Sequence, residues 1–515
     1  MEFCMKKILH LIFGRFFVVA MAIILQVLWL CVVLWQLSYK FTYVNLLVRV
    51  IAIIVVLVIV NKWTNPANKL SWTFLILLSP VFGLMVYLLF GRSGLTKHTR
   101  ERMDAVNRQV EALFQRDTAA EEELEKESRS AYLQSSYIDK WAGFPLYQNT
   151  QTKYYRCGEE MFPDMLEALR GAEHFIFLEY FIIEEGYMFN TILDILEEKA
   201  KAGVDVRFIY DDVGSINSIS FGYYKKLQER GIPCVTFNPF KPLISVVMNN
   251  RDHRKIFVVD GYIGFTGGIN LADEYINKVQ RFGYWKDTGI RLEGEAVWSM
   301  TTMFLEMWNY INHSSEDYKQ FMPQVYQKAP FEEDGYVQPY GDTPLDHETV
   351  GENIYLNIIN HAERYVYIFT PYLIIDNEML VSLCNAAKRG VDVRIVTPGI
   401  PDKKMIFLLT QSHYEPLLKC GVKIYQYPPG FIHAKSFLCD DKIGTVGSIN
   451  LDYRSLYLHF ECGVFMYKTK ALMQLKEDCM DTFAASEEMT LEFCRGQNVF
   501  IRIFQGMMRL FAPLL

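Results

Sequence analysis

One pattern, H-x-K-x4-D, occurs twice in this chain, and each copy is followed by G-x-x-N. In both copies the glycine of G-x-x-N lies fourteen residues after the histidine. The residues that carry the pattern are His253, Lys255 and Asp260 in the first copy and His433, Lys435 and Asp440 in the second. The chain has only 10 histidines in 515 residues, so two chance matches in the same frame are very improbable. The repeat indicates an internal duplication that carries one chemistry.

The sequence around the two copies is duplicated as well. Each half has a run typical of a buried strand, at residues 175–183 and 365–375, followed by a stretch of helical pattern. Each helical stretch ends at a glycine that opens the repeated sequence G-V-D-V-R, Gly203 in one half and Gly390 in the other. Strands that alternate with helices predict α/β layers. We therefore expect two α/β halves related by a pseudo-twofold axis.

Changes in composition divide the chain into six segments. The expected segments are a membrane anchor (1–92), a charged helical connector (93–133), a first half (134–326), a linker (327–352), a second half (353–494) and a C-terminal amphipathic segment (495–515). In the last segment apolar residues alternate with Arg502 and Arg509, which is typical of a helix lying on a bilayer. Packing of this helix on the soluble body is an equally good interpretation.

The expected anchor contains two to three apolar spans. Residues 16–37 and 44–60 are close to the length of about 20 apolar residues that crosses a bilayer. Residues 70–90 carry Ser79-Pro80 midway, which predicts a kinked or re-entrant hairpin. Basic residues flank every span, and three full crossings would not keep all of them in the cytoplasm. We expect a retained multi-pass anchor, with the region that follows it facing the cytoplasm.

Composition argues against two other classes of protein. The formal net charge is −7, whereas a nucleic-acid-binding protein normally carries a basic stripe. The 10 cysteines include no C-x-x-C pair, which favours reduced thiols over a disulfide framework or a zinc site.

The two copies together suit phosphoryl transfer through a covalent intermediate. On a strand, the histidine and lysine of H-x-K point to the same side, because side chains alternate. Two facing copies supply one imidazole to attack phosphorus and another to move the proton of the alcohol. The lysines and two asparagines, Asn270 and Asn450, would neutralise the phosphoryl oxygens without a metal.

Both copies resemble the signature of the phospholipase D superfamily, and the flanking residues are similar to those of bacterial cardiolipin synthases of the phospholipase-D type. The segments that carry this resemblance are residues 87–92, 210–215, 285–288, 370–372, 450–455, 460–461 and 509–515. The resemblance covers nearly the whole chain from about Val44 onward. It implies two phospholipase-D-like halves, preceded by transmembrane helices, in an enzyme of the bacterial cell membrane.

The resemblance also implies residue roles. Catalytic roles fall on His253, Lys255, Asp260, His433, Lys435 and Asp440, the two aspartates fixing their loops rather than touching substrate. Asp287 and Glu461 are candidates for orienting the imidazoles, or else structural carboxylates. Asn270, Asn450 and Ser448 are candidates for binding the substrate phosphate, with Gly268 standing where the second copy has Ser448.

The implied reaction joins two phosphatidylglycerol molecules into cardiolipin and glycerol through a phosphatidyl-histidine. The alternatives are a phospholipase D hydrolase, a transferase using another alcohol, a nuclease of the same superfamily and an inactive membrane scaffold. The intact pairs of histidine and lysine argue against the scaffold, and the net charge argues against the nuclease. We expect membrane lipid as the partner, no nucleic acid, no metal and no other cofactor. The sequence does not distinguish which histidine attacks, and it leaves the oligomeric state open.

Overall fold

The body of the molecule is built on two large sheets. A computed structural model describes residues 42–91, 110–239, 250–327, 329–346 and 348–514, with isolated positions among residues 21–36 and at 101 and 103. The strands before residue 300 are β1 (Thr150–Tyr155), β2 (Phe175–Tyr180), β3 (Asp205–Asp211), β4 (Cys234–Phe237), β5 (Arg251–Asp252), β6 (Ile256–Val259), β7 (Ile263–Gly267), β8 (Tyr284–Lys286) and β9 (Gly289–Gly294). Those after it are β10 (Tyr336–Asp342), β11 (Tyr365–Phe369), β12 (Asp392–Pro398), β13 (Lys423–Tyr427), β14 (Gly430–Ile432), β15 (Ser436–Cys439), β16 (Ile443–Gly447), β17 (His459–Tyr467) and β18 (Glu487–Glu488).

The two sheets have the same strand order. The first runs β1-β9-β7-β6-β2-β3-β4 and the second β10-β17-β16-β15-β11-β12-β13, with β18 added at its edge. In each sheet three strands are parallel (β2, β3, β4 and β11, β12, β13), and the remaining neighbours on this path are antiparallel. The repeated G-V-D-V-R lies where a helix turns into a parallel strand, and its glycine has φ +93° at Gly203 and +97° at Gly390. The expected pair of related α/β halves is confirmed.

Helices cover the sheets and join them. In the first half they are α9 (Gly158–Gly171), α10 (Tyr187–Lys201), α11 (Tyr223–Glu229), α12 (Val297–Asn312) and α13 (Pro323–Tyr326). In the second half they are α14 (Val350–His361), α15 (Asn377–Lys388), α16 (Lys404–Ser412), α17 (Tyr414–Lys419), α18 (Tyr453–Tyr457), α19 (Lys470–Ala484) and α20 (Leu491–Gly496). Helix α12 packs on β6 of the first sheet and on β10 of the second. One apolar core therefore runs through both halves, and it includes Phe177, Phe304 and Ile368.

The segment expected to be a linker has structure of its own. Residues 327–352 contain β10, which pairs antiparallel with β17 as β1 pairs with β9, and they also contain the start of α14. In the expected connector, α7 (Thr118–Glu127) is followed by α8 (Arg129–Tyr137). Leu124 and Ala131 of these helices are buried against Tyr336 and Tyr467. Both segments are thus part of the packed body.

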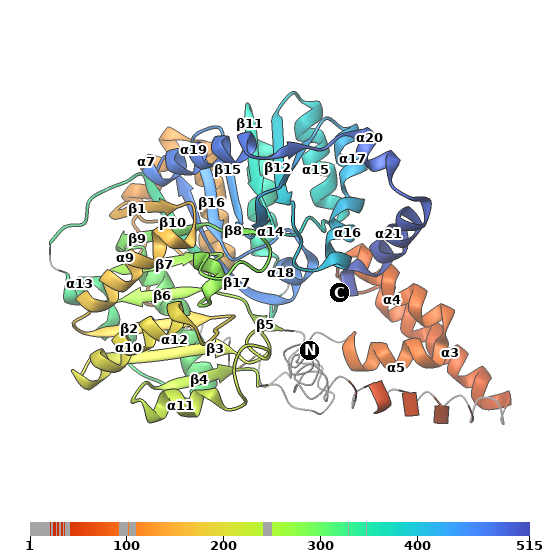
Figure 1. The fold of residues 1–515 in the computed structure, drawn as a ribbon, viewed down its shortest axis with the longest axis horizontal. Helices are drawn as coiled ribbons and strands as arrows, with labels where there is room; N and C mark the ends of the chain where they lie inside the picture. The colour runs from red at the N-terminus through yellow and green to blue at the C-terminus, as the bar shows by residue number, and fades with distance from the viewer. Residues whose placement is uncertain are drawn as a thin grey trace, which may run out of the picture.

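The N-terminal helices form an arm that leaves the body at one side (Figure 1). Helix α3 (Thr42–Val60) contains the one helical span among the described residues that is long and apolar enough to cross a membrane, Tyr43–Val60. Helices α4 (Pro66–Leu78) and α5 (Pro80–Phe90) are separated at the predicted break. With 13 and 11 residues each is about 20 Å long or shorter, less than the hydrocarbon thickness of a bilayer. The span expected at residues 16–37 lies largely outside the described residues.

The C-terminal helix α21 (Val499–Phe511) lies beside this arm and packs on α16 and α4. The Ser71 hydroxyl of α4 donates a hydrogen bond to the carbonyl of Leu510, at 2.6 Å. Within α21 the polar residue Gln505 is buried, whereas a set of apolar residues is exposed: Val499, Phe500, Ile501, Ile503, Phe504 and Met507. One side of α21 therefore packs on protein, and an apolar side does not.

Candidate active site

The chain just before each motif histidine crosses to the other half. Strand β5 pairs with β17, and β14 pairs with β8, both in parallel. At the end of these short pairings the amide of His253 donates to the carbonyl of Phe460, at 2.9 Å. The amide of His433 donates to the carbonyl of Lys286 in the same way, at 2.6 Å. The two motifs are thus brought together at the junction of the halves.

Each imidazole is held by a carboxylate of the opposite half. His253 Nδ1 lies 2.9 Å from both carboxylate oxygens of Glu461. His433 Nδ1 lies 2.7 Å from Oδ2 of Asp287. All four side chains are buried. A carboxylate on Nδ1 fixes the tautomer and leaves Nε2 as the nitrogen available for chemistry.

A buried lysine accompanies each histidine. Lys255 Nζ donates to the carbonyl oxygen of His253 at 2.5 Å, and Lys435 Nζ donates to that of His433. Burial lowers the pKa of Lys255 to about 8 and that of Lys435 to about 7. Two ammonium groups with weakened proton affinity at a buried site favour the binding of an anion.

The electrostatics keep the resting imidazoles neutral. Burial, followed by the charges of Lys255 and Lys435, lowers the pKa of His253 well below its ordinary value. The pKa of His433 is lowered to about 4 by burial and by Lys435. Burial would raise the pKa of Asp287, but His433 and Lys435 outweigh it and the pKa is lowered. A neutral imidazole beside an ionised carboxylate suits a nucleophile.

The two motif aspartates lie at turns and fix them. Asp260 and Asp440 have left-handed backbones, with φ 49° and 54°. The Asp260 carboxylate accepts hydrogen bonds from the amides of residues 173, 174 and 175, where β2 begins. Asp440 accepts from the amides of residues 363, 364 and 365 at the start of β11. Each aspartate therefore ties its motif strand to the neighbouring central strand.

The two asparagines differ in their surroundings. Asn270 accepts from the Ile182 amide at 3.0 Å and donates to the Tyr275 hydroxyl at 2.8 Å. The side-chain oxygen of Asn450 is buried and has no hydrogen-bond partner among the described residues. The Asn450 amide is thus not fixed through its oxygen as that of Asn270 is, so it is the one that can turn and donate an N–H to a ligand oxygen.

The difference between Gly268 and Ser448 follows from the two carboxylates. A Cβ at Gly268 would lie 2.0 Å from Asp287 Oδ1, so no side chain fits there. In the other half Ser448 Oγ donates to Glu461 Oε2, at 2.5 Å. The hydroxyl that the sequence suggested for phosphate binding is therefore engaged with Glu461, and it helps to hold that carboxylate.

One residue of the site escaped the sequence reasoning. His459 lies two positions before Glu461, as Trp285 lies two positions before Asp287. Its ring centre is 5.6 Å from that of His253, and its Nδ1 is 3.7 Å from Glu461 Oε1. The equal spacing of His459 and Trp285 from the two carboxylates could have pointed to His459. The two side chains differ in chemistry, however, so the spacing did not mark His459 as a site residue.

Among the described residues, His253, His459 and Glu461 can bring one possible metal ligand each within 4.8 Å of one another. The carboxylate of Glu461 is already engaged by His253 and Ser448. The ammonium groups of Lys255 and Lys435 are close enough to lower the pKa of His253. They would oppose a bound cation as well, so these residues fit a metal ion poorly. The expected absence of a metal stays a prediction.

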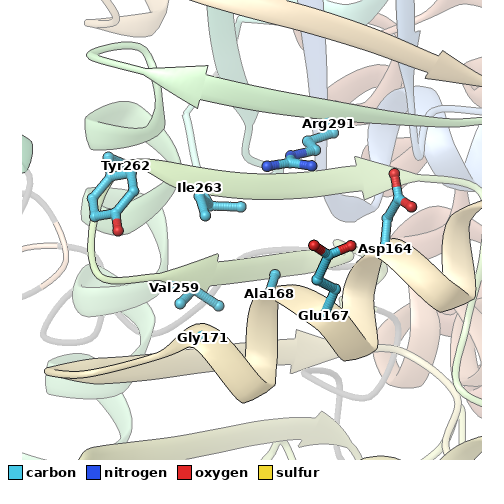
Figure 2. Close-up of a pocket in the computed structure, with 8 residues that line it drawn as sticks. All are labelled: Asp164, Glu167, Ala168, Gly171, Val259, Tyr262, Ile263 and Arg291. Atoms are coloured by element: carbon cyan, nitrogen blue, oxygen red, sulfur yellow. The ribbon is translucent and has the colours of Figure 1, made fainter. Parts of the chain in front are cut away.

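A surface hollow lies elsewhere, between α9 and the turn that joins β6 to β7 (Figure 2). Its lining residues are Asp164, Glu167, Ala168, Gly171, Val259, Tyr262, Ile263 and Arg291. Asp164 already accepts from Lys153 and Tyr155, both at 2.5 Å. The hollow includes neither motif histidine, and we assign it no role.

Comparison with known proteins agrees with the duplicated site. Residues 165–289 and 355–481 each match the family model described as cardiolipin synthase, phospholipase-D-like domain. Residues 50–92 match a model described as phospholipase D-nuclease N-terminal. The solved phosphatidylserine synthase of Haemophilus influenzae shares the fold, with a TM-score of 0.56 at 14% identity over 75% of this chain and 98% of that one.

Curated relatives match over most of their length. An uncharacterized protein of Streptococcus mutans is 44% identical over 89% of this chain and 99% of its own. A cardiolipin synthase of Alkalihalophilus pseudofirmus is 35% identical over 88% of this chain and 90% of its own. Another, from Halalkalibacterium halodurans, is 33% identical over 92% of this chain and 93% of its own. With both repeats, the N-terminal region and these relatives in agreement, the chain belongs to the phospholipase-D-like cardiolipin synthase family of phosphatidyltransferases.

Proposed function

We propose that this protein transfers the phosphatidyl group of one phosphatidylglycerol to a second one, giving cardiolipin and glycerol. The observation that carries the proposal is the crossed pairing of His253 with Glu461 and of His433 with Asp287. Two buried and oriented imidazoles, each with an adjacent lysine, supply what a double displacement at phosphorus needs. The relatives named cardiolipin synthase support this choice of lipid.

In the first step Nε2 of one imidazole attacks phosphorus. A P–N bond forms while the P–O bond to the head-group glycerol breaks, and the second imidazole gives its proton to the departing oxygen. In the second step that imidazole takes the proton of a hydroxyl on the second phosphatidylglycerol. The oxygen attacks phosphorus, the P–N bond breaks and the first histidine is restored.

This scheme needs one protonated and one neutral imidazole, although both pKa values are low in the free protein. A bound phosphodiester adds a negative charge, which raises the pKa of the imidazoles beside it. Lys255, Lys435 and Asn450 would carry the charge of the non-bridging oxygens. Asp260 and Asp440 would act on the loops alone, and Ser448 would hold Glu461.

We also propose a multi-pass protein of the bacterial cell membrane whose two halves face the cytoplasm. The apolar span of α3, the short pair α4 and α5, and the basic residues around them support this arrangement. The exposed apolar side of α21 would lie in the membrane interface beside α4. The lipid head groups would then reach the histidines from the membrane side.

The test is incubation of the full-length protein in detergent with phosphatidylglycerol alone, followed by lipid mass spectrometry and a glycerol assay. Cardiolipin and glycerol should appear in equal amounts, and H253A and H433A should each abolish both products. The matched control is H361A, which alters an exposed histidine of α14. Phosphatidic acid in place of cardiolipin would show a hydrolase instead, and full activity in either single motif variant would refute the mechanism.

A further inference from the structure

The two sides of the active centre are equivalent in backbone but differ in chemistry, although an aromatic ring, that of Phe181, also lies against His253, at 4.8 Å between ring centres. In the parallel pairing of β5 with β17, Arg251 faces His459. At the equivalent place in the pairing of β14 with β8, Phe431 faces Trp285. The helical turn after each G-x-x-N motif differs in the same sense, because Arg454 lies four residues after Asn450 whereas Glu274 lies four residues after Asn270.

The side next to His433 is closed by aromatic rings. The ring centres of Trp285, Tyr275 and Phe431 lie 5.3, 5.6 and 5.8 Å from that of His433. The indole of Trp285 also donates to Asp287, at 3.3 Å. Glu274 adds a negative charge on this side: Arg281 lies 3.4 Å from its Oε1, and its Oε2 is buried without a hydrogen-bond partner among the described residues.

The side next to His253 carries cationic and polar groups with unused hydrogen-bonding capacity. Both ring nitrogens of His459 and Nη1 of Arg251 are buried with no hydrogen-bond partner in the part of the chain that the structure describes. The His459 side chain is 10% exposed. A buried polar group without a partner costs free energy, so such a cluster is evidence for a ligand.

Arg454 completes this cluster. It is exposed, and its guanidinium makes no ion pair with any of the described residues, whereas that of Arg251 lies 3.4 Å from the buried carboxylate of Asp211. Helix α18, which carries Arg454, packs on β17, which begins at His459. After burial, which is the larger cause, the charge of Arg454 also lowers the pKa of that imidazole. An unpaired guanidinium beside a neutral imidazole with an available N–H is a suitable site for phosphate oxygens.

We propose that His459 and Arg454, backed by Arg251, form a subsite for a second phosphate beside the reacting one, and that it takes the phosphodiester of the acceptor phosphatidylglycerol. This inference rests on the proposed function, because only an acceptor lipid brings a second phosphate to the site. In phosphatidylglycerol the attacking hydroxyl and the phosphodiester occupy the two ends of one glycerol. A cationic group one glycerol away from the histidines would therefore distinguish the lipid from water and from free glycerol.

The test measures how the phosphatidyl-enzyme divides between two acceptors, phosphatidylglycerol and free glycerol. Full-length protein is given phosphatidylglycerol and isotopically labelled glycerol, and the ratio of cardiolipin to labelled phosphatidylglycerol is measured. Both products come from the same phosphatidyl-enzyme, but only cardiolipin needs an acceptor with a phosphate. The ratio does not depend on the rate of the first step or on the amount of folded protein.

R454Q and H459N should each lower this ratio about tenfold, the loss expected for one hydrogen bond to a charged group. R454K, which keeps the positive charge, should lower the ratio less than R454Q does. E274Q, at the equivalent place in the other half, should leave the ratio unchanged. An unchanged ratio in both R454Q and H459N would overturn the subsite, even if the two products fell together.

A wild-type protein that forms labelled phosphatidylglycerol but no cardiolipin would refute the proposed function and not the subsite. The subsite is then judged with glycerol 3-phosphate, which carries a phosphate on the same glycerol skeleton without the lipid. Preference for glycerol 3-phosphate over glycerol, lost in R454Q and H459N, would support a general phosphate subsite. No such preference in the wild type would overturn it.

Discussion

The imidazole of His253 is oriented by Glu461, a residue more than two hundred positions later in the chain, with Nδ1 2.9 Å from both carboxylate oxygens. His433 and Asp287 repeat the relationship in the opposite direction. Each half thus completes the reactive group of the other, so neither half alone contains an oriented histidine. This explains why the short pairings of β5 with β17 and of β14 with β8 lie directly before the histidines.

Neutral replacement of either carboxylate should impair turnover more than binding. E461Q and D287N keep the shape of the side chain but lose the charge that stabilises an imidazolium. We expect kcat to fall by up to about 10⁴-fold, the effect seen when the carboxylate beside a catalytic histidine is made neutral. The measurement is cardiolipin formation at saturating phosphatidylglycerol. A fall in kcat/KM with no change in kcat would contradict this role.

Exchanging the equivalent residues Gly268 and Ser448 should have unequal effects on activity. In G268S the new Cβ would lie 2.0 Å from Asp287 Oδ1, so the carboxylate must move away from His433. In S448G the hydroxyl loses its hydrogen bond to Glu461 and its hydrogen bonds with the backbone of Cys462, but no side chain is displaced, and each lost bond costs about 1 kcal/mol in a typical case. We expect G268S to be nearly inactive and S448G to keep a substantial part of its activity. Equal losses in the two variants would contradict the explanation.

The fall of kcat/KM at alkaline pH should reflect the deprotonation of Lys255 and Lys435. Since burial lowers the pKa of Lys255 to about 8 and of Lys435 to about 7, kcat/KM should fall as pH rises beyond these values. The folded pKa of each is below the ordinary value of 10.5, so the unfolded chain binds more protons in this window. These lysines therefore add stability as pH rises from about 7 to 10.

Activity should thus decline between about pH 7 and 10, although deprotonation of Lys255 and Lys435 does not destabilise the fold in that range. K435R keeps its charge at high pH and should move this fall to higher pH, whereas K404R, at an exposed position of α16, should not. Thermal unfolding measured alongside separates the two effects. An alkaline loss of activity that tracks unfolding would refute the assignment.

The apolar side of α21 should matter only when a bilayer is present. Phe500 and Met507 are 76% and 59% exposed, so a double change to glutamate removes no packed core. We expect F500E/M507E to lower activity on phosphatidylglycerol vesicles while activity in mixed micelles stays close to that of the wild type. V381E, at a 45% exposed position of α15, is the matched control. Equal activity of the double variant in vesicles and in micelles would show that α21 does not lie on the membrane.

Local patterns in the sequence predicted the two α/β halves and the motif residues, because strand burial, turn glycines and motif spacing are encoded over short stretches. The break at Ser79-Pro80 was predicted for the same reason. The crossing of the halves was not, because it depends on pairing between residues such as Arg251 and His459 that are far apart in the chain.

Two further features depend on long-range packing. Strand β10 lies in a stretch whose polar, glycine and proline content suggested a linker, and its pairing with β17 overrides that local signal. The role of Ser448 depends on the position of Glu461, which no local pattern encodes. Composition gives no hint that the backbone-equivalent residues Trp285 and His459 line opposite sides of one centre.

The most direct test of the account is the stereochemical course of transfer at phosphorus. A phosphorothioate analogue of phosphatidylglycerol with defined configuration is converted to product by the full-length protein, and the configuration of the product is determined. Two successive in-line displacements, first by a histidine and then by the acceptor hydroxyl, predict retention of configuration. Inversion would mean a single direct displacement, and it would contradict a phosphatidyl-histidine intermediate whatever lipid is formed.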